Sequence, residues 1–172
     1  RYVAQGGDWG SVITQSMGLT ETEFCAGIHI NMPLVIPNPD TMADLTEREQ
    51  SALQSMAEYG EKGSGYSKQQ STYPQTLGYG LADSPVGQMA WIMEKFYLWT
   101  DCEKNGNRHP ENILSKDELL DNVMVYWLNN AGASSARLYW ESFSNPSMEP
   151  IDMPVGCSIF PHELFRSSRR WA

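Results

Sequence analysis

Short apolar runs lie near both ends of this chain, and helical patterns fill its middle. Residues 2–5 form a β-prone run that ends at Gly6 and Gly7, and residues 11–17 follow with apolar side chains at helical spacing. Residues 27–32 then indicate a second strand. A strand, a glycine turn, a helix and a second strand in this order predict a parallel α/β sheet.

The middle of the chain is predicted to be a block of helices. Thr46 and Ser115 are each followed three residues later by a glutamate, which is the spacing of a capping box at a helix start. Glycines from Gly60 onward are expected to break the first helix, and the polar residues 101–112 predict an exposed loop. The predicted helices cover residues 46–59, 74–81, 84–100, 115–129 and 133–143.

A third strand is predicted at residues 154–160, so the helical block is inserted between two strands of one sheet. The expected domains are an α/β core over residues 1–36, a helical block over 37–150 and a return to the core over 151–172. Both ends of the chain lie close to structured patterns, and we therefore expect an internal fragment of a longer protein.

Composition and charge narrow the classes of function. Hydrophobic residues make up 41% of the 172 residues, which is typical of a globular protein. The formal net charge of -9 excludes a protein that binds nucleic acid through its phosphates, because the only basic cluster is Arg166, Arg169 and Arg170. No apolar run reaches the length of about 20 residues that a membrane span needs.

The three cysteines, Cys25, Cys102 and Cys157, are too far apart in sequence for a zinc-binding or redox motif. Their odd number argues against a framework of disulfides and favours a reducing compartment. The sequence therefore predicts a cytoplasmic location and leaves open a membrane anchor upstream of residue 1.

The segment Gly6-Gly7-Asp8-Trp9-Gly10 stands where the first strand turns into the first helix. Small residues at positions 6 and 10 are expected to let the backbone approach closely, as in a nucleophile elbow, with Asp8 in the place of the usual serine. A carboxylate is anionic without help from a base and can attack carbon, and the backbone N–H of Trp9 would be one oxyanion donor. The alternative is an ordinary aspartate N-cap.

Six blocks of the chain resemble the microsomal and juvenile-hormone type of epoxide hydrolase and its bacterial and fungal relatives. These blocks follow the family order and spread along nearly the whole chain. They are QGGDWG at 5–10, SGY at 64–66, ADSPVG at 82–87, EKF at 94–96, LDNVMVYW at 120–127 and SSARLY at 134–139.

The resemblance implies an α/β-hydrolase core with a helical cap, and it implies roles for four residues. Asp8 matches the nucleophile, Tyr66 and Tyr139 match the two cap tyrosines, and Glu163 matches the acid of the catalytic triad. The expected reaction opens a small apolar epoxide through an ester on Asp8, which water hydrolyses to a diol. No metal or organic cofactor is required.

Each of these residues also has an ordinary structural interpretation. A buried tyrosine such as Tyr66 or Tyr139 often only packs its ring and bonds its hydroxyl. Glu163 could be a carboxylate in the first turn of a helix, and Trp9 could belong to the core or to a pocket wall. Trp91, Trp127 and the apolar residues around Met89 could equally line a core or a tunnel.

None of the three histidines fits the role of catalytic base. His29 lies in the second strand, where a packed or backbone-bonded side chain is expected, His109 lies in a polar loop, and His162 precedes Glu163 in the chain. The family's catalytic histidine and the loop that completes the oxyanion hole are expected outside residues 1–172. The isolated polypeptide is therefore predicted to be inactive.

Two other functions remain open on the sequence alone. A haloalkane dehalogenase also has an aspartate nucleophile followed by tryptophan, but it would not need the two cap tyrosines. A catalytically silent binding protein of the same fold would hold an apolar ligand under the cap. The preferred epoxide, the stereochemistry and the oligomeric state are likewise open.

Overall fold

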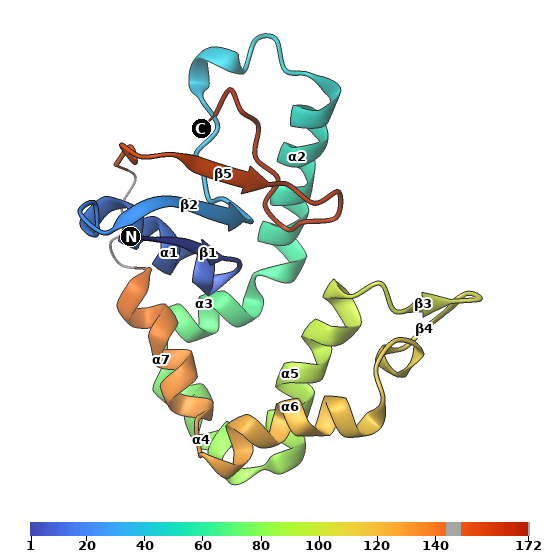
Figure 1. The fold of residues 1–172 in the computed structure, drawn as a ribbon. Coiled ribbons are helices and arrows are strands. Elements are labelled where there is room, and N and C mark those ends of the chain that lie inside the picture. Colours follow the sequence, from blue (N-terminus) through green and yellow to red (C-terminus); the bar gives the residue numbers. More distant parts are fainter. Residues whose placement is uncertain (144–148, 172) are drawn as a thin grey trace. The chain divides into compact units, whose positions relative to one another are not determined.

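The computed structural model describes residues 1–143 and 149–171. The chain divides into two compact units (Figure 1). The first unit comprises Arg1–Ser64 and Pro146–Ala172, and the second comprises Gly65–Asn145. Residues 37–64, which the sequence pattern assigned to the helical block, therefore group with the sheet in the first unit.

The first unit is built on a three-stranded parallel sheet. The strands β1 (Tyr2–Gly6), β2 (Cys25–Asn31) and β5 (Val155–Ser158) lie in the order β1-β2-β5 and run in the same direction (Figure 1). Gly6 pairs with Ile30, and Asn31 pairs with Ser158. The carboxyl ends of all three strands therefore meet at one edge of the sheet.

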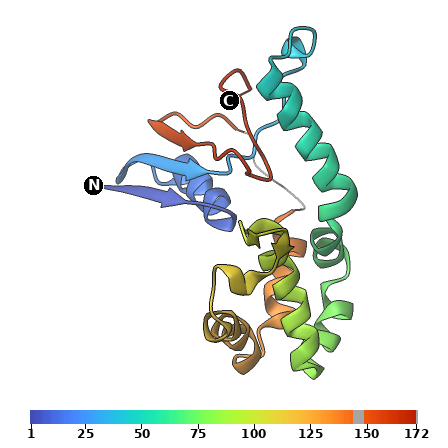
Figure 2. The same ribbon diagram turned by 90° about the vertical axis from the view of Figure 1, so that its right-hand side faces the viewer.

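Helix α1 (Trp9–Thr20) packs against β1 and β2 and covers one face of this sheet (Figure 2). Ile28 and Ile30 of β2 are each only 4% exposed, so the central strand supplies much of this small core. The predicted order of strand, turn, helix and strand is thus confirmed, with α1 longer at both ends than its apolar pattern indicated.

Helix α2 (Glu47–Glu58) begins at Thr46 with the expected capping box. The predicted end of this helix near Tyr59 is confirmed, since α2 ends at Glu58. The glycines do not break the helical path, however, because a π-helical turn (Tyr59–Gly63) continues α2 and helix α3 (Gly65–Thr72) begins after Ser64. In this turn a Cβ atom on Gly63 would lie 2.8 Å from Cδ2 of Tyr59, and the Ser64 hydroxyl donates to the carbonyl of Gly60 at 2.8 Å.

The second unit contains α3 and four further helices, α4 (Pro74–Asp83), α5 (Pro85–Trp99), α6 (Lys116–Leu128) and α7 (Gly132–Ser142). Helices α3 and α4 pack on α7, and α5 packs on α4 and α6. Gly78 and Gly132 allow this close packing: a Cβ atom on Gly78 would lie 2.6 Å from Cβ of Ala133, and one on Gly132 would lie 2.6 Å from Oε1 of Gln88.

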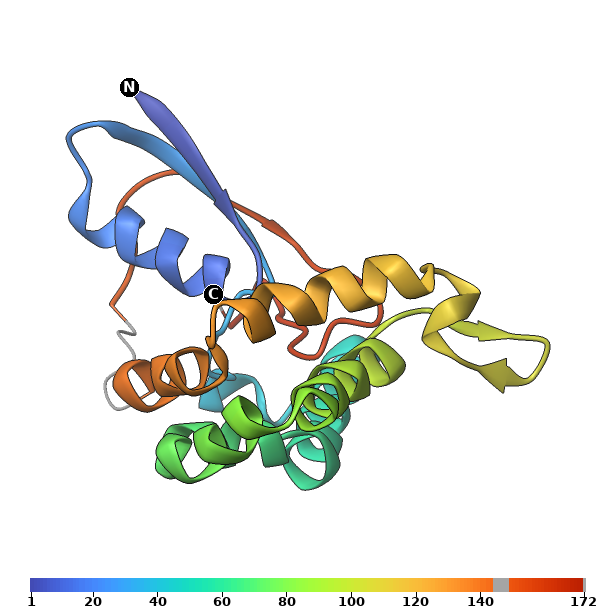
Figure 3. The same ribbon diagram turned by 90° about the horizontal axis from the view of Figure 1, so that it is seen from below.

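Residues 101–112 do not form the simple exposed loop that their polarity predicted. They contain a short hairpin, β3 (Glu103–Lys104) with β4 (Asn107–Arg108), which extends away from the helices (Figure 3), and a 3-10 turn (Pro110–Asn112). Cys102, before the hairpin, is fully buried. Arg108 donates to the carbonyl of Tyr97 at 2.7 Å and so satisfies an acceptor in the last turn of α5.

Of the helices within the described ranges 1–143 and 149–171, none combines the length and the hydropathy needed to cross a bilayer.

Candidate active site

Asp8 occupies a sharp turn between β1 and α1. Its backbone has φ 52° and ψ -127°, a conformation that a residue with a side chain adopts only at a cost. The carbonyl of Asp8 accepts from the N–H of Ser11 at 3.0 Å, which starts α1 directly after the turn. This is the strand, strained residue and helix arrangement of a nucleophile elbow.

The turn depends on Gly6 more than on Gly10. A Cβ atom on Gly6 would lie 2.0 Å from the carbonyl oxygen of Gly10 and 2.5 Å from Oγ1 of Thr14. A Cβ atom on Gly10 would meet nothing within 4 Å, so the expectation that position 10 must be small was wrong. It is the backbone of Gly10, and not its missing side chain, that makes the close approach.

Asn31, at the end of β2, supports the turn from the neighbouring strand, and sequence reasoning missed it. A Cβ atom on Gly7 would lie 2.4 Å from Nδ2 of Asn31, so the amide side chain lies directly against this glycine. Gln5 donates from Nε2 to Oδ1 of Asn31 at 3.1 Å and holds the amide there. The only available sequence signal was the position of a polar residue at the carboxyl end of a strand.

The Asp8 carboxylate is held by the next backbone amide. The N–H of Trp9 donates to Oδ1 of Asp8 at 2.6 Å. An ordinary N-cap has extended backbone and accepts from an amide two or three positions on, as Thr46 and Ser115 do in this chain. Asp8 differs from them in backbone conformation and in the amide it binds, so it is not an ordinary cap.

Glu163 follows β5, and its N–H donates to the carbonyl of Phe160 at 3.2 Å in a turn. Because β1 and β5 run parallel in one sheet, the segments that carry Asp8 and Glu163 both leave the same edge of that sheet. The predicted nucleophile and acid thus lie in one compact unit, at the edge where α/β proteins place their sites.

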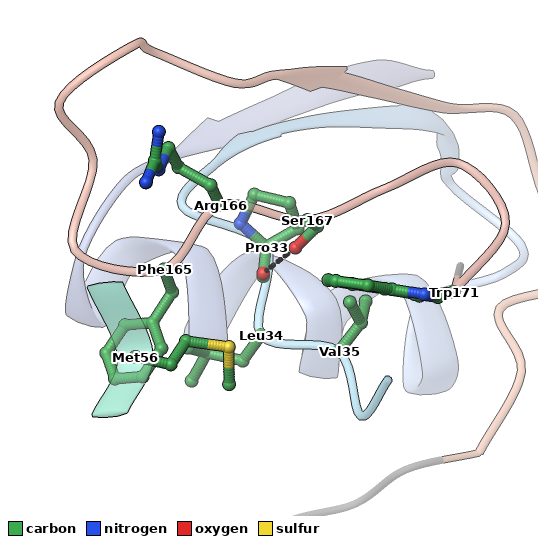
Figure 4. Close-up of a pocket in the computed structure, with 8 residues that line it drawn as sticks. All are labelled: Pro33, Leu34, Val35, Met56, Phe165, Arg166, Ser167 and Trp171. Atoms are coloured by element: carbon green, nitrogen blue, oxygen red, sulfur yellow. Dashed lines mark hydrogen bonds between the residues drawn. The ribbon is translucent and has the colours of Figure 1, made fainter. Parts of the chain in front are cut away.

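The chain after Glu163 is anchored to the loop that follows β2. The Ser167 hydroxyl donates to the carbonyl of Pro33 at 2.7 Å beside a cavity of about 170 Å³ (Figure 4). Figure 4 shows Phe165 on one side of this cavity and Trp171 on the other, with the guanidinium of Arg166 directed away from it. The cavity lining is mostly apolar and comes from residues Pro33, Leu34, Val35, Met56, Phe165, Arg166, Ser167 and Trp171.

Glu49 anchors the same segment to the start of α2. Besides its capping bonds to Thr46, the carboxylate accepts from the Ser168 hydroxyl at 2.6 Å and from Nε of Arg170 at 3.1 Å. The Ser168 hydroxyl, the Thr46 amide and Arg170 together lower the pKa of Glu49 from 4.5 to about 2, despite its burial. The basic residues that the sequence grouped at positions 166 and 170 are thus occupied by contacts within the unit.

The two predicted cap tyrosines lie together in the second unit. Tyr66, in the first turn of α3, and Tyr139, in α7, have ring centres 5.8 Å apart at an interplanar angle of 80°. Trp99 of α5 stands 5.4 Å from Tyr66, and Phe143 stands 5.4 Å from Tyr139. Tyrosines that are 73 positions apart in the chain therefore share one aromatic cluster.

The structure describes contacts for two of the three histidines. His29 is exposed, its ring lies against Gly156 of β5, and its Nε2 atom lies 3.0 Å from the Ser158 hydroxyl, so the bond that it makes is to a side chain and not to the backbone. His109 caps the 3-10 turn, with Nδ1 accepting from the N–H of Glu111 at 3.2 Å. Within residues 1–143 and 149–171, no three His, Cys, Asp or Glu side chains are grouped so that they could hold a metal ion.

No family model matches the chain. Among curated proteins, one from Stigmatella aurantiaca is 51% identical to this chain over 172 residues, and its name assigns it provisionally to the epoxide hydrolases. The match covers 99% of this chain and 38% of that protein. It is 34% identical over 195 residues to Epoxide hydrolase 1 of Sus scrofa, covering 99% of this chain and 42% of that protein. The chain thus spans about two fifths of the length of these relatives.

Solved structures agree with these relatives. The epoxide hydrolase of Aspergillus niger matches with a TM-score of 0.82 at 29% identity, over 99% of this chain and 42% of that one. The juvenile hormone epoxide hydrolase of the silkworm Bombyx mori matches with a TM-score of 0.81 at 30% identity, over 96% of this chain and 44% of that one. The partial parallel sheet and the helices are therefore part of an α/β-hydrolase fold.

Proposed function

Because the chain belongs to the epoxide hydrolases of the α/β-hydrolase type, we propose that the protein opens a small apolar epoxide and releases a diol. The observation that carries this proposal is the elbow with Asp8 at its centre, since a carboxylate in that place favours covalent attack on carbon. Of the predicted block 37–150, the helices that fall in the second unit would form the cap of this enzyme, and a cytoplasmic location would suit its three free cysteines.

In the first step, one oxygen of the Asp8 carboxylate attacks an epoxide carbon and the ring C–O bond breaks. The electron pair of that bond stays on the epoxide oxygen, which takes a proton from Tyr66 or Tyr139 and becomes a hydroxyl group. Tyrosine suits this role because its hydroxyl is protonated at neutral pH. The product of the step is a hydroxyalkyl ester on Asp8.

In the second step, water attacks the carbonyl carbon of the ester and the diol leaves. The Oδ1 atom of Asp8, which accepts from the N–H of Trp9, would be the oxygen that carries the negative charge of the tetrahedral intermediate. A histidine oriented by Glu163 would take the proton from water. The step returns Asp8 as a carboxylate and supplies the proton that restores the tyrosine.

This mechanism predicts where solvent oxygen goes. In a single turnover of the intact protein in heavy-oxygen water, with the epoxide limiting, the label should enter the Asp8 carboxylate, and the diol should carry the original Asp8 oxygen. Mass spectrometry of the peptide containing Asp8 and of the diol measures both. A label found only in the diol would instead mean direct attack by water on the epoxide.

Two controls define the background. Enzyme kept in heavy-oxygen water without epoxide should leave the peptide unlabelled. The Asp8→Ala variant should lose at least about 10⁴-fold in activity, whereas Asp121→Ala, at an exposed position on α6, should keep it. Failure of the intact protein to turn over any epoxide would overturn the proposal.

A further inference from the structure

A lysine stands against the ring of one of the two cap tyrosines. The Nζ atom of Lys95, on α5, lies 4.2 Å from the ring centre of Tyr66 and 5.3 Å from that of Trp99. Lys95 and Trp99 are four positions apart on α5, so they present the ammonium and the indole to Tyr66 from one face of that helix. A cation at this distance from an aromatic ring is attracted to its π-electrons.

The placement of Lys95 is unusual for a lysine. Its side chain is only 16% exposed, whereas that of Lys116 in the same unit is 74% exposed. Lysine side chains are seldom buried to this extent unless the charge has partners. Here the ammonium donates to the carboxylate of Glu94, and the rings of Tyr66 and Trp99 supply the remaining contact.

From this contact we propose that Lys95 is a positioning residue for Tyr66, one that holds its ring and stabilises the phenolate formed when Tyr66 gives its proton to the epoxide oxygen. The inference rests on the proposed function. When the O–H bond of Tyr66 breaks, its electron pair stays on the phenol oxygen and spreads into the ring. The Lys95 ammonium attracts this charged ring more strongly than the neutral one. It therefore favours proton donation by Tyr66 in addition to holding the ring in place.

The test compares two epoxides on the intact protein. One carries plain alkyl groups, and the other carries an electron-withdrawing group beside the ring oxygen, so its alkoxide is a weaker base that needs less help from a proton donor. The rate of ester formation on Asp8 is followed in single turnovers by rapid acid quenching. Lys95→Met should slow the plain epoxide about 10-fold or more and the activated one clearly less.

Two matched variants complete the test. Lys95→Arg keeps the cation over the ring and should restore most of the rate. Lys116→Met makes the same change at an exposed lysine and should behave as the unmodified protein. Because both epoxides are measured on the same preparation, a loss of folded protein cancels from the ratio of their rates.

Equal slowing of both epoxides by Lys95→Met, no slowing, or no rescue by arginine would each overturn the role of Lys95. None of these results would affect the proposed function, because heavy-oxygen labelling of Asp8 would still occur. Absence of that labelling in the unmodified protein would instead overturn the proposed function.

Discussion

The backbone N–H of Trp9 lies 2.6 Å from Oδ1 of Asp8, so a hydrogen bond joins the carboxylate of the candidate nucleophile to the first residue of α1. This bond makes the two carboxylate oxygens of Asp8 different, since Oδ1 is the one that accepts it. The direction of the side chain is set by the backbone turn. The backbone around Asp8 is strained, and neighbouring groups must therefore hold it. Gly6, Gly7 and Asn31 are the groups that the structure places there.

The first prediction concerns the two glycines that flank the turn. Gly6→Ala should lower the free energy of unfolding by about 2–3 kcal/mol, because its Cβ atom would lie 2.0 Å from a backbone oxygen that cannot move away. Gly10→Ala should be neutral or stabilising by up to about 1 kcal/mol, because its Cβ atom has open space in a helix. Urea denaturation of both variants makes the comparison, and equal destabilisation would contradict the described turn.

Gly7 offers a test of the support from Asn31. The Cβ atom of Gly7→Ala would overlap the Asn31 amide, which is the movable end of a side chain. We expect the variant to fold but to lose about 10- to 100-fold in kcat, because the Asp8 side chain is displaced. Adding Asn31→Ala removes the obstacle and should recover part of the loss. A double variant no better than the sum of its single changes would show that the two residues do not interact.

The sequence revealed those structural features whose residues lie within a few positions of one another in the chain. Thr46 and Ser115 begin helices with the expected capping boxes, because the partner glutamates lie within one turn. The turn at Asp8 was recognisable for the same reason, since its strand, glycines and helix are contiguous.

Helix α3, which carries Tyr66, gave no such signal. Its sequence GYSKQQST has no apolar periodicity, and the helix instead depends on packing against α7 and on contacts such as the bond from Trp91 to Gln70 at 3.0 Å. The contacts of Asn31 with Gly7, of Glu49 with Arg170 and of Lys95 with Tyr66 also join residues far apart in the chain. Only the folded structure brings these pairs together, so no local pattern could have identified these contacts.

Glu49 gives a prediction about stability and pH. Its pKa is lowered to about 2 in the folded protein, so the unfolded chain takes up the proton first as the pH falls. The stabilisation is therefore complete above about pH 4.5 and is lost as the pH falls toward 2. Glu49→Gln should lower the melting temperature at neutral pH, and the difference from the unmodified protein should shrink in acid.

The control for this prediction is Glu47→Gln, an exposed glutamate in the first turn of the same helix. It should change the melting temperature little and show no such dependence on pH. If the two variants melted alike at every pH, the contacts of Glu49 with Ser168 and Arg170 would not stabilise the fold.

We predict that removing only the hydroxyl groups of Tyr66 and Tyr139 separates their role as proton donors from the packing of their rings. Tyr66→Phe and Tyr139→Phe keep the rings that pack 5.8 Å apart, so both variants should stay folded at the assay temperature. Each should slow epoxide opening about 100-fold or more, because a proton donor is lost. Tyr73→Phe, at a tyrosine that is 70% exposed, should have no effect. If both variants kept their activity, the two tyrosines would have a purely structural role.

Glu163 is predicted to act on the second step alone. If it orients the histidine that activates water, Glu163→Gln should leave ester formation on Asp8 nearly unchanged and slow ester hydrolysis roughly 10²- to 10⁴-fold. The ester would then accumulate, and acid quenching followed by mass spectrometry of the Asp8 peptide would show it as a burst. Glu23→Gln, at an exposed position before β2, should give no accumulation. Slower ester formation in Glu163→Gln, without any burst, would mean that Glu163 supports the elbow and not the hydrolytic water.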